Sequence, residues 1–179
     1  MEEKYRPSAF VEVQGGQTKI KSVDWWTPPE IFSKLNIEFD LDVASPEGGV
    51  PWIPAKEYYT EQQDGLLSDW HGTVWMNPPY GKHTAVWLEK FVEHGDGIAL
   101  VFARTDTKWF QEVCVKADAL LFCKGRLAFY RSGEKGANAA SGSLFVACGD
   151  KSVEALKNSV DPKPKQLITR KERGDLLFI

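Results

Sequence analysis

Two consecutive prolines, Pro78 and Pro79, interrupt the chain directly after the β-branched and aromatic segment at residues 73–76. Proline fixes φ and donates no backbone hydrogen bond, so a proline pair can neither continue a central strand nor enter the interior of a helix. A strand over residues 73–76 must therefore end and turn here. The pair is flanked by an amide, Asn77, and a phenol, Tyr80. Any fold for this chain has to accommodate that turn at the end of a strand.

Hydrophobic spacing on both sides of the turn predicts helices alternating with strands. One helix is expected to start with Thr27 as N-cap, Pro28 at the first helical position and Glu30 completing a capping box. Two further helices are expected over residues 83–94 and 106–117. Strands are expected over residues 37–43, 73–76, 97–103, 118–123, 126–130 and 142–148. This order predicts an α/β domain with a mainly parallel sheet, whose ligands bind beyond the carboxyl ends of the strands.

The remaining segments predict one folded domain with irregular flanks. Residues 1–23 are expected to be an irregular leader, residues 24–149 to form the domain, and residues 150–179 to be a short helix followed by a polar tail. Residues 44–72 are expected to be mostly loop, and so long a loop inside a domain usually has a function. Residues 131–142 are polar and glycine-rich, which predicts a mobile loop.

Composition argues against several classes of protein. The apolar runs are far shorter than the roughly 20 residues that span a bilayer, and the acidic start lacks an apolar signal core, so a cytoplasmic protein is expected. The 3 cysteines have no paired spacing, which predicts reduced thiols. The 3 histidines are scattered and form no zinc pattern, so no metal is expected.

The distribution of charge says more than the net value of −3. Residues 1–103 carry 8 Lys and Arg against 16 Asp and Glu, whereas residues 104–179 carry 14 against 9. Such asymmetry indicates a basic face that can meet phosphate, although a solvated tail would give the same counts.

The residue types at the turn suit the binding of an aromatic amine. The Asn77 amide oxygen and the Pro78 carbonyl are two neighbouring acceptors that can hold the two hydrogens of a planar amino group. Tyr80 offers a flat face on which a heteroaromatic ring can stack. The alternative is structural: a proline pair that only ends a strand, with the asparagine making a local turn bond.

This turn, Asn77-Pro78-Pro79-Tyr80 after a strand, resembles the catalytic motif of amino-methyltransferases that use S-adenosylmethionine. The segments "DWWTPPEIFSKL", "FDLDVAS", "DGLLSDWHGTVWMNPPYG", "WLEKF", "ARTDTKWF", "GRLAFY" and "GSLFVACG" occur in the order seen in the compact DNA N-6-adenine-methyltransferase family of phages and prophages. The resemblance covers about residues 24–149. It implies a single-domain, Rossmann-like methyltransferase fold with helices on both faces of the sheet, in the cytoplasm of a bacterium or a phage-infected host. It also implies methylation of the N6 amine of adenine in double-stranded DNA, with the base flipped out of the duplex.

The resemblance also implies a set of cofactor-binding residues for S-adenosylmethionine: Thr27, Pro28, Asp42, Ala44, Asp64 and Asn77. Thr27 and Pro28 would contact the methionine end, Asp42 would lie at the end of the first strand, and Asp64 would accept from the adenine amino group. The first strand departs from the family's usual pattern because no G-x-G follows it, and the glycines come late, at positions 48 and 49.

The catalytic residues implied by the resemblance are Asn77, Pro78, Pro79 and Tyr80. Basic side chains around the pocket would contact phosphate, and an aromatic on a later strand would form a second wall against the base, unless that aromatic belongs to the core. The expected DNA-contacting residues are Arg104, Lys108, Lys124, Arg126, Phe129 and Arg131, with Lys135 in the loop.

Other functions stay open at this point. The same motif serves methyltransferases that act on RNA, on protein glutamine or on the N4 amine of cytosine. A catalytically silent DNA-binding or anti-restriction relative would keep the fold without the reaction. The sequence predicts neither the target DNA sequence nor the oligomeric state.

Overall fold

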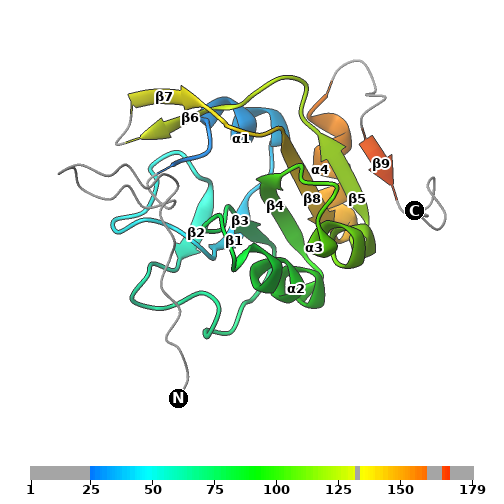
Figure 1. Ribbon diagram of the computed structural model, residues 1–179. Coiled ribbons are helices and arrows are strands. Elements are labelled where there is room, and N and C mark those ends of the chain that lie inside the picture. Colours follow the sequence, from blue (N-terminus) through cyan, green and yellow to red (C-terminus); the bar gives the residue numbers. More distant parts are fainter. Residues whose placement is uncertain (1–24, 132–133, 161–166, 170–179) are drawn as a thin grey trace, which may run out of the picture.

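A seven-stranded sheet forms the centre of the computed structural model, which describes residues 25–131, 134–160 and 167–169. The strand order is β2-β1-β3-β4-β8-β5-β9, and a separate pair, β6-β7, forms a second sheet. The strands of the main sheet are β1 (Phe39–Asp42), β2 (Ala55–Tyr58), β3 (Val74–Met76), β4 (Gly97–Phe102), β5 (Ala119–Phe122), β8 (Ser143–Cys148) and β9 (Leu167–Thr169). The separate pair consists of β6 (Ala128–Arg131) and β7 (Glu134–Asn138), and Figure 1 shows it apart from the main sheet.

Most strands of the main sheet run in one direction. Strands β2, β1, β3 and β4 pair in parallel. Strand β8 is antiparallel to both β4 and β5, so β5 runs in the same direction as β4, and β9 is reversed against β5. The expected α/β fold with a mainly parallel sheet is therefore confirmed. The carboxyl ends of the five co-directional strands share one edge of the sheet.

Helices cover both faces of this sheet, as expected. The helices are α1 (Pro29–Leu35), α2 (Thr84–His94), α3 (Lys108–Glu112) and α4 (Asp150–Asn158), with a 3-10 turn at Cys114–Lys116. Apolar residues of α2 and α3 pack with one set of strand side chains, and those of α1 and α4 pack with the alternate set. Figure 1 shows α2 and α3 on one side of the sheet and α4 on the other. Alternation along each strand feeds both cores.

Strand β4 illustrates how burial follows from sequence. All six of its residues are buried, with Ala99 and Val101 in the core under α2 and α3, and with Ile98 and Leu100 in the core under α1 and α4. A strand covered on both faces needs an uninterrupted apolar run, which is what the sequence supplies here.

The start of α1 differs from the expectation. Helix α1 begins at Pro29 rather than Pro28, its N-cap is Pro28, and no side-chain capping bond forms. Pro28 has ψ 139° because a residue before a proline is driven away from helical backbone, and this pushes the start along by one residue. The predicted capping box of Thr27 and Glu30 is therefore wrong, which leaves the Thr27 hydroxyl for another role.

Two strands formed where loops were expected. Strand β2 lies inside residues 44–72 and pairs with β1 at the edge of the sheet, and β7 occupies much of residues 131–142 by pairing with β6. Strand β9 also joins the sheet from within the expected tail. The expected leader, residues 1–23, lies outside the described residues. No helix in the described part of the chain is both long and apolar enough to cross a membrane.

The three cysteines are free thiols in the structure. Cys114 and Cys148 are buried and Cys123 is partly exposed. Burial raises the pKa of Cys123 to about 11 and those of Cys114 and Cys148 to about 12, so all three are neutral thiols at physiological pH.

Candidate active site

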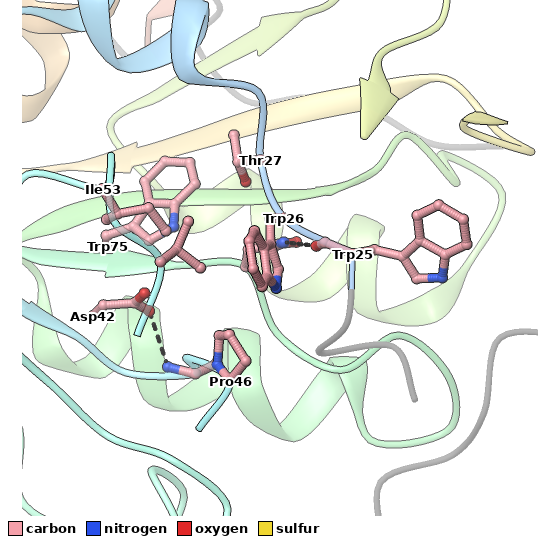
Figure 2. Close-up of a pocket in the computed structure, with 10 residues that line it drawn as sticks. Trp25, Trp26, Thr27, Asp42, Pro46, Ile53 and Trp75 are labelled. Atoms are coloured by element: carbon pink, nitrogen blue, oxygen red, sulfur yellow. Dashed lines mark hydrogen bonds between the residues drawn. The ribbon is translucent and has the colours of Figure 1, made fainter. Parts of the chain in front are cut away.

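The carboxyl ends of β1 and β3 form the centre of the site. The two strands pair in parallel with Asp42 opposite Trp75, and the sheet continues in opposite directions from them, to β2 beyond β1 and to β4 beyond β3. In doubly wound sheets such a reversal opens a crevice beyond the strand ends. A small hollow of about 10 Å³ lies there, with its surrounding side chains drawn in Figure 2. Its lining residues are Trp25, Trp26, Thr27, Asp42, Ala44, Pro46, Val50, Ile53, Trp75 and Asn77.

Asn77 stands one residue beyond β3 with both ends of its amide hydrogen-bonded. Its Nδ2 donates to the main-chain carbonyl of Trp25 at 3.0 Å, and its Oδ1 accepts from the Tyr80 hydroxyl at 3.0 Å. The dashed line that ends on the Trp25 carbonyl in Figure 2 is the first of these bonds. A carbonyl only accepts, so the amide nitrogen faces Trp25 and the amide oxygen faces the other way. An amide oxygen has two lone pairs, which leaves capacity for one more donor.

Pro78 and Pro79 are both buried and stiffen the turn that follows. Within the described part of the chain, the Pro78 carbonyl receives no backbone hydrogen bond. The turn therefore presents two acceptors on successive residues, the side-chain oxygen of Asn77 and the main-chain oxygen of Pro78. Two neighbouring acceptors of this kind can receive the two hydrogens of an amino group.

Tyr80 is buried under the turn rather than displayed on a surface. Its ring is 7% exposed and stacks on Phe102, with ring centroids 4.2 Å apart and an interplanar angle of 21°. Its hydroxyl reaches both Asn77 Oδ1 and the Leu100 carbonyl, the latter at 3.3 Å. Burial raises the pKa of Tyr80 far above its usual range, so the phenol keeps its proton and remains a donor. In this position Tyr80 supports the Asn77 amide.

Asp42 ends β1 and is buried, in contrast with the solvent-facing acid that an alternating strand would place there. Its side chain is 3% exposed and accepts from the Ala44 backbone N–H at 3.2 Å. Burial raises the pKa of Asp42 to about 7, and hydrogen bonds from the Ala44 backbone and the Ser45 side chain oppose that shift. A carboxyl group so placed changes charge near neutral pH, and strongly perturbed acids in a crevice are typical of functional sites.

Buried hydroxyl and indole groups without partners surround the same hollow. Among the described residues, the Oγ1 of Thr27 and the Nε1 of Trp26 and Trp75 have no hydrogen-bond partner. Thr27 is fully buried. Buried polar atoms are nearly always bonded in folded proteins, so unpartnered ones at a strand-end crevice are what a site for a polar ligand would show.

A second, larger hollow of about 220 Å³ continues from the first over the ends of β1 and β2. The two share Asp42, Val50 and Ile53. The larger hollow is further lined by Ser45, Gly48, Gly49, Pro51, Ala55 and Tyr58. Gly48 and Gly49 have φ values of 82° and 73°, which L side chains rarely adopt. Their turn follows β1, where the family resemblance leads one to expect a G-x-G loop.

Asp64 does not line either hollow, but its loop is fixed beside them. Its carboxylate accepts from the Leu66 backbone N–H at 3.1 Å, and its own φ is 52°. The next residue, Gly65, lies so close to the Val43 carbonyl after β1 that an added Cβ would be 2.1 Å from it. Lys90 of α2 donates to the carbonyls of Gly65, Leu66 and Ser68, which holds residues 64–68 against the helix. The loop that carries Asp64 therefore reaches the end of β1, with Asp64 engaged in a local turn.

The expected DNA-contacting cations gather on the edge that carries Asn77. Arg104 and Lys108 follow the carboxyl end of β4, and Lys124 and Arg126 follow that of β5. All four are exposed, as is Arg131 at the end of β6. Residues spread over the second half of the sequence thus share one side of the sheet with the turn, because parallel strands all end there.

Phe129 is an exception to the expected set. Its side chain is 4% exposed and belongs to the core formed with α1 and α4. The expectation that it contacts DNA is therefore corrected: a strand residue at this position points into the core, which was the alternative open from sequence.

Three residues of the site were not predicted from the sequence. The Trp25 carbonyl orients Asn77, Phe102 stacks on Tyr80, and Lys82 is exposed directly after the turn. Proximity to the motif would have found Lys82. A main-chain contact over 52 residues of sequence, such as that of Trp25 with Asn77, has no residue-specific pattern to reveal it.

No group of three or more His, Cys, Asp or Glu side chains in the described ranges could hold a metal ion. Comparison with known proteins gives one match. A family model described as "DNA N-6-adenine-methyltransferase (Dam)" matches residues 15–176, which is most of the chain. No curated protein and no solved structure matches the chain.

Proposed function

The chain belongs to the DNA N-6-adenine-methyltransferase (Dam) family, and from that premise we propose that it transfers a methyl group from S-adenosylmethionine to the N6 amine of adenine in double-stranded DNA. The family implies a DNA adenine methyltransferase in general terms. The cofactor, the flipped base and the roles of individual residues are part of the proposal, and the geometry at the ends of β1 and β3 supports them.

The architecture supports a Rossmann-like assignment. Setting aside the two reversed strands, β8 and β9, the order is 2-1-3-4-5, which is one of the two common orders of doubly wound α/β folds. Its reversal point lies between β1 and β3, and ligands of such folds bind outside the carboxyl ends of those strands. In this chain that position holds Asp42 on one side and Asn77 on the other.

The observation that carries the proposal is the pair of acceptors on Asn77 and Pro78. The amide is already oriented with its oxygen away from Trp25, and the Pro78 carbonyl has no backbone donor among the described residues. Together they would receive the two hydrogens of the N6 amine and draw electron density toward its nitrogen. The nitrogen would then be held for in-line formation of an N–C bond as the S–C bond of the sulfonium breaks, with a thioether as leaving group and one N6 proton released. Catalysis of this kind needs positioning and no covalent enzyme intermediate.

Burial of the turn implies that the adenine leaves the duplex. Pro78, Pro79 and Tyr80 are all buried at the strand end, so an amine inside a base stack does not reach their acceptors. Enzymes that modify a base flip it into a pocket for this reason. The small hollow holds little more than a water in this conformation, so one of its walls has to shift to admit a ring.

Residues at the end of β1 hold the cofactor in this proposal. When bound, S-adenosylmethionine supplies an electrophilic methyl group on a sulfonium. The Thr27 hydroxyl donates to its methionine end, the Ala44 region packs beside it, and Asp42 accepts from its amino or hydroxyl groups in the ionised form. Asp64 accepts from its adenine amine, which requires the local turn bond to Leu66 to be shared or exchanged.

Duplex DNA lies on the basic side of the edge in this proposal. Arg104, Lys108, Lys124, Arg126 and Arg131 neutralise phosphates and fix the register of the duplex, while carrying no sequence information themselves. Lys82, directly after the turn, joins this set.

The decisive experiment is incubation of the protein with methyl-labelled S-adenosylmethionine and plasmid DNA, followed by nucleoside analysis. Formation of N6-methyladenine is the expected result. Label in N4-methylcytosine, in RNA or in protein glutamine would assign one of the other substrates of this motif. Cofactor binding measured by calorimetry separates a silent relative, which would show no affinity for S-adenosylmethionine.

A further inference from the structure

The short segment around Trp25 joins the catalytic turn to the β6–β7 pair. Trp26 exchanges two backbone hydrogen bonds with Tyr130 of β6, at 2.8 and 2.9 Å. The indole of Trp52 donates to the Thr27 carbonyl at 2.8 Å and lies edge-on to both Trp26 and Tyr130. Residues 26 and 27 are thus bonded on both sides by parts of the chain that come much later in the sequence.

Trp25 itself is seated by a glycine of β7. A Cβ added at Gly136 would lie 2.8 Å from the Trp25 ring and 2.9 Å from the Phe129 carbonyl. Such distances do not occur in real proteins, and the second contact is to main chain, which cannot swing away. Only glycine therefore lets the Trp25 ring rest on the β6–β7 pair as it does here.

The carbonyl of the same tryptophan receives the Asn77 amide. The bond from Asn77 Nδ2 to the Trp25 carbonyl fixes which end of the amide faces the substrate side, because the amide oxygen carries no hydrogen to donate to a carbonyl. A 180° turn of the amide would oppose two acceptors at Trp25 and would also remove the acceptor from the Tyr80 hydroxyl. The position of one main-chain carbonyl therefore decides whether Asn77 presents an oxygen or a nitrogen to an amine.

We infer that Trp25 is a positioning residue for Asn77 and that the β6–β7 pair, through Gly136, sets its place. The inference deepens the proposed function, on which it rests for the role of Asn77 as amine acceptor. It assigns to the separate two-stranded sheet a purpose in the reaction: it holds the carbonyl that orients the catalytic amide. Trp25 does not touch the reacting atoms and acts only through Asn77.

The test compares two glycine substitutions. Gly136→Ala pushes on the Trp25 ring, whereas Gly142→Ala places its Cβ at an ordinary 3.7 Å from the nearest atom and is the matched control. In ¹⁵N-labelled protein without DNA or cofactor, the side-chain amide resonance of Asn77 is expected to shift in Gly136→Ala and to stay in place in Gly142→Ala. Under single-turnover conditions at saturating cofactor and DNA, Gly136→Ala is expected to slow methyl transfer about tenfold or more, since small misplacements of catalytic groups are costly.

The affinity for S-adenosylmethionine is expected to stay within about twofold of the wild type in both variants, since neither Gly136 nor Gly142 lines either hollow. If Gly136→Ala unfolds, Trp25→Phe tests the same point, because it shortens the ring that meets Gly136 and leaves the main chain in place. An unmoved Asn77 resonance in both of these variants, with wild-type transfer rates, would overturn the inference. Failure of the wild type to form N6-methyladenine would instead reject the proposed function, and the resonance would still report on Trp25.

Discussion

The neighbouring ends of β1 and β3 differ in how completely their polar groups are bonded. At β3, the Asn77 amide is engaged at both ends and the Tyr80 hydroxyl contacts two acceptors. Beside the end of β1, the buried hydroxyl of Thr27 and the buried indole N–H groups of Trp26 and Trp75 have no partner within the described residues. The polar groups at the end of β3 are therefore already hydrogen-bonded in the free protein, whereas some of those beside the end of β1 are not.

This difference suits two different roles, polarising a reacting amine and binding a cofactor. A group that polarises a reacting amine gains from being fixed before the substrate arrives, because no reorganisation is then needed in the transition state. A group that binds a cofactor can wait, because the ligand brings the missing hydrogen-bond partners. We therefore propose that the β3 end serves the reaction and that the β1 end binds the cofactor.

The largest effect is expected from Asn77→Ala. Loss of the oriented acceptor should lower the single-turnover rate of methyl transfer by about 100-fold or more, in the range seen when one preorganised polar group is removed from a catalytic site. Affinity for S-adenosylmethionine, measured by calorimetry, should change by no more than about threefold, since the β1 end is untouched. A variant that keeps its rate and loses cofactor affinity would reverse the assignment of the two strand ends.

The next effect is expected from Asp42→Asn, and it should have the opposite profile. Loss of the carboxylate should weaken S-adenosylmethionine binding about tenfold, the usual scale for one hydrogen bond to a charged group. Because the pKa of Asp42 is about 7, wild-type affinity should rise with pH up to about 7 and then level off, whereas the variant should show a flat profile. Calorimetric titrations from pH 5.5 to 8.5, a range chosen to bracket about 7, measure this directly.

The pH dependence of the free energy of unfolding tests independently whether Asp42 is protonated in the folded protein. The folded protein keeps a proton on Asp42 up to about pH 7, while the unfolded chain releases it near the ordinary value of 3.8. The folded state therefore binds more protons, and this group lowers the free energy of unfolding as pH rises from about 4 to 7, by about 4 kcal/mol at most. Asp42→Asn should remove that fall in thermal unfolding experiments. Identical pH profiles for the two proteins would show that Asp42 is not held neutral.

Much of the fold followed from the sequence because burial leaves a periodic trace. The apolar run at residues 97–103 became β4, buried on both faces, and the helical spacing at residues 83–94 became α2. Strand β2 left no such trace, since three of its four residues are exposed and its strand geometry comes from pairing with β1 at the sheet edge. Strand β7 is likewise defined by its partner β6 and not by its glycine-containing sequence.

The site divides in the same manner. Residue types at the turn, and the basic residues that follow later strands, could be named from the sequence because side chains carry their chemistry. The burial of Asp42 could not, since an acid that alternates with Phe39 and Leu41 reads as solvent-facing, and only the crevice beside β3 encloses it. The Trp25 carbonyl is a main-chain atom that any residue would supply, so no residue type marks it.

A smaller effect is expected for a lysine on the shared edge, which serves both strand ends by holding the duplex over them. Lys124 follows the carboxyl end of β5 and Lys116 precedes its amino end, and both are exposed. Lys124→Ala should weaken binding of every duplex sequence by about fivefold and reduce the salt slope by about 1, whereas Lys116→Ala should change neither. Equal effects of the two lysines in fluorescence anisotropy titrations would show that the duplex does not favour the edge that carries Asn77.

The smallest effect is expected from Thr27→Ala. This variant tests most directly whether polar groups beside the end of β1 lack hydrogen-bond partners in the free protein. The Thr27 hydroxyl is buried without a partner among the described residues and caps no helix, so its removal should leave thermal stability unchanged or slightly raised. Thr84 is the matched comparison, because its buried hydroxyl bonds to both the amide and the carbonyl of Gly81, and Thr84→Ala should cost about 1 kcal/mol in the free energy of unfolding. Binding of S-adenosylmethionine should show the opposite ranking of the two variants. Thr27→Ala should bind the cofactor about threefold more weakly, because the Thr27 hydroxyl gains its hydrogen-bond partner only from the ligand. If Thr27→Ala destabilises the free protein as much as Thr84→Ala does, the hydroxyl is already bonded within the chain, and the contrast between the two strand ends does not hold.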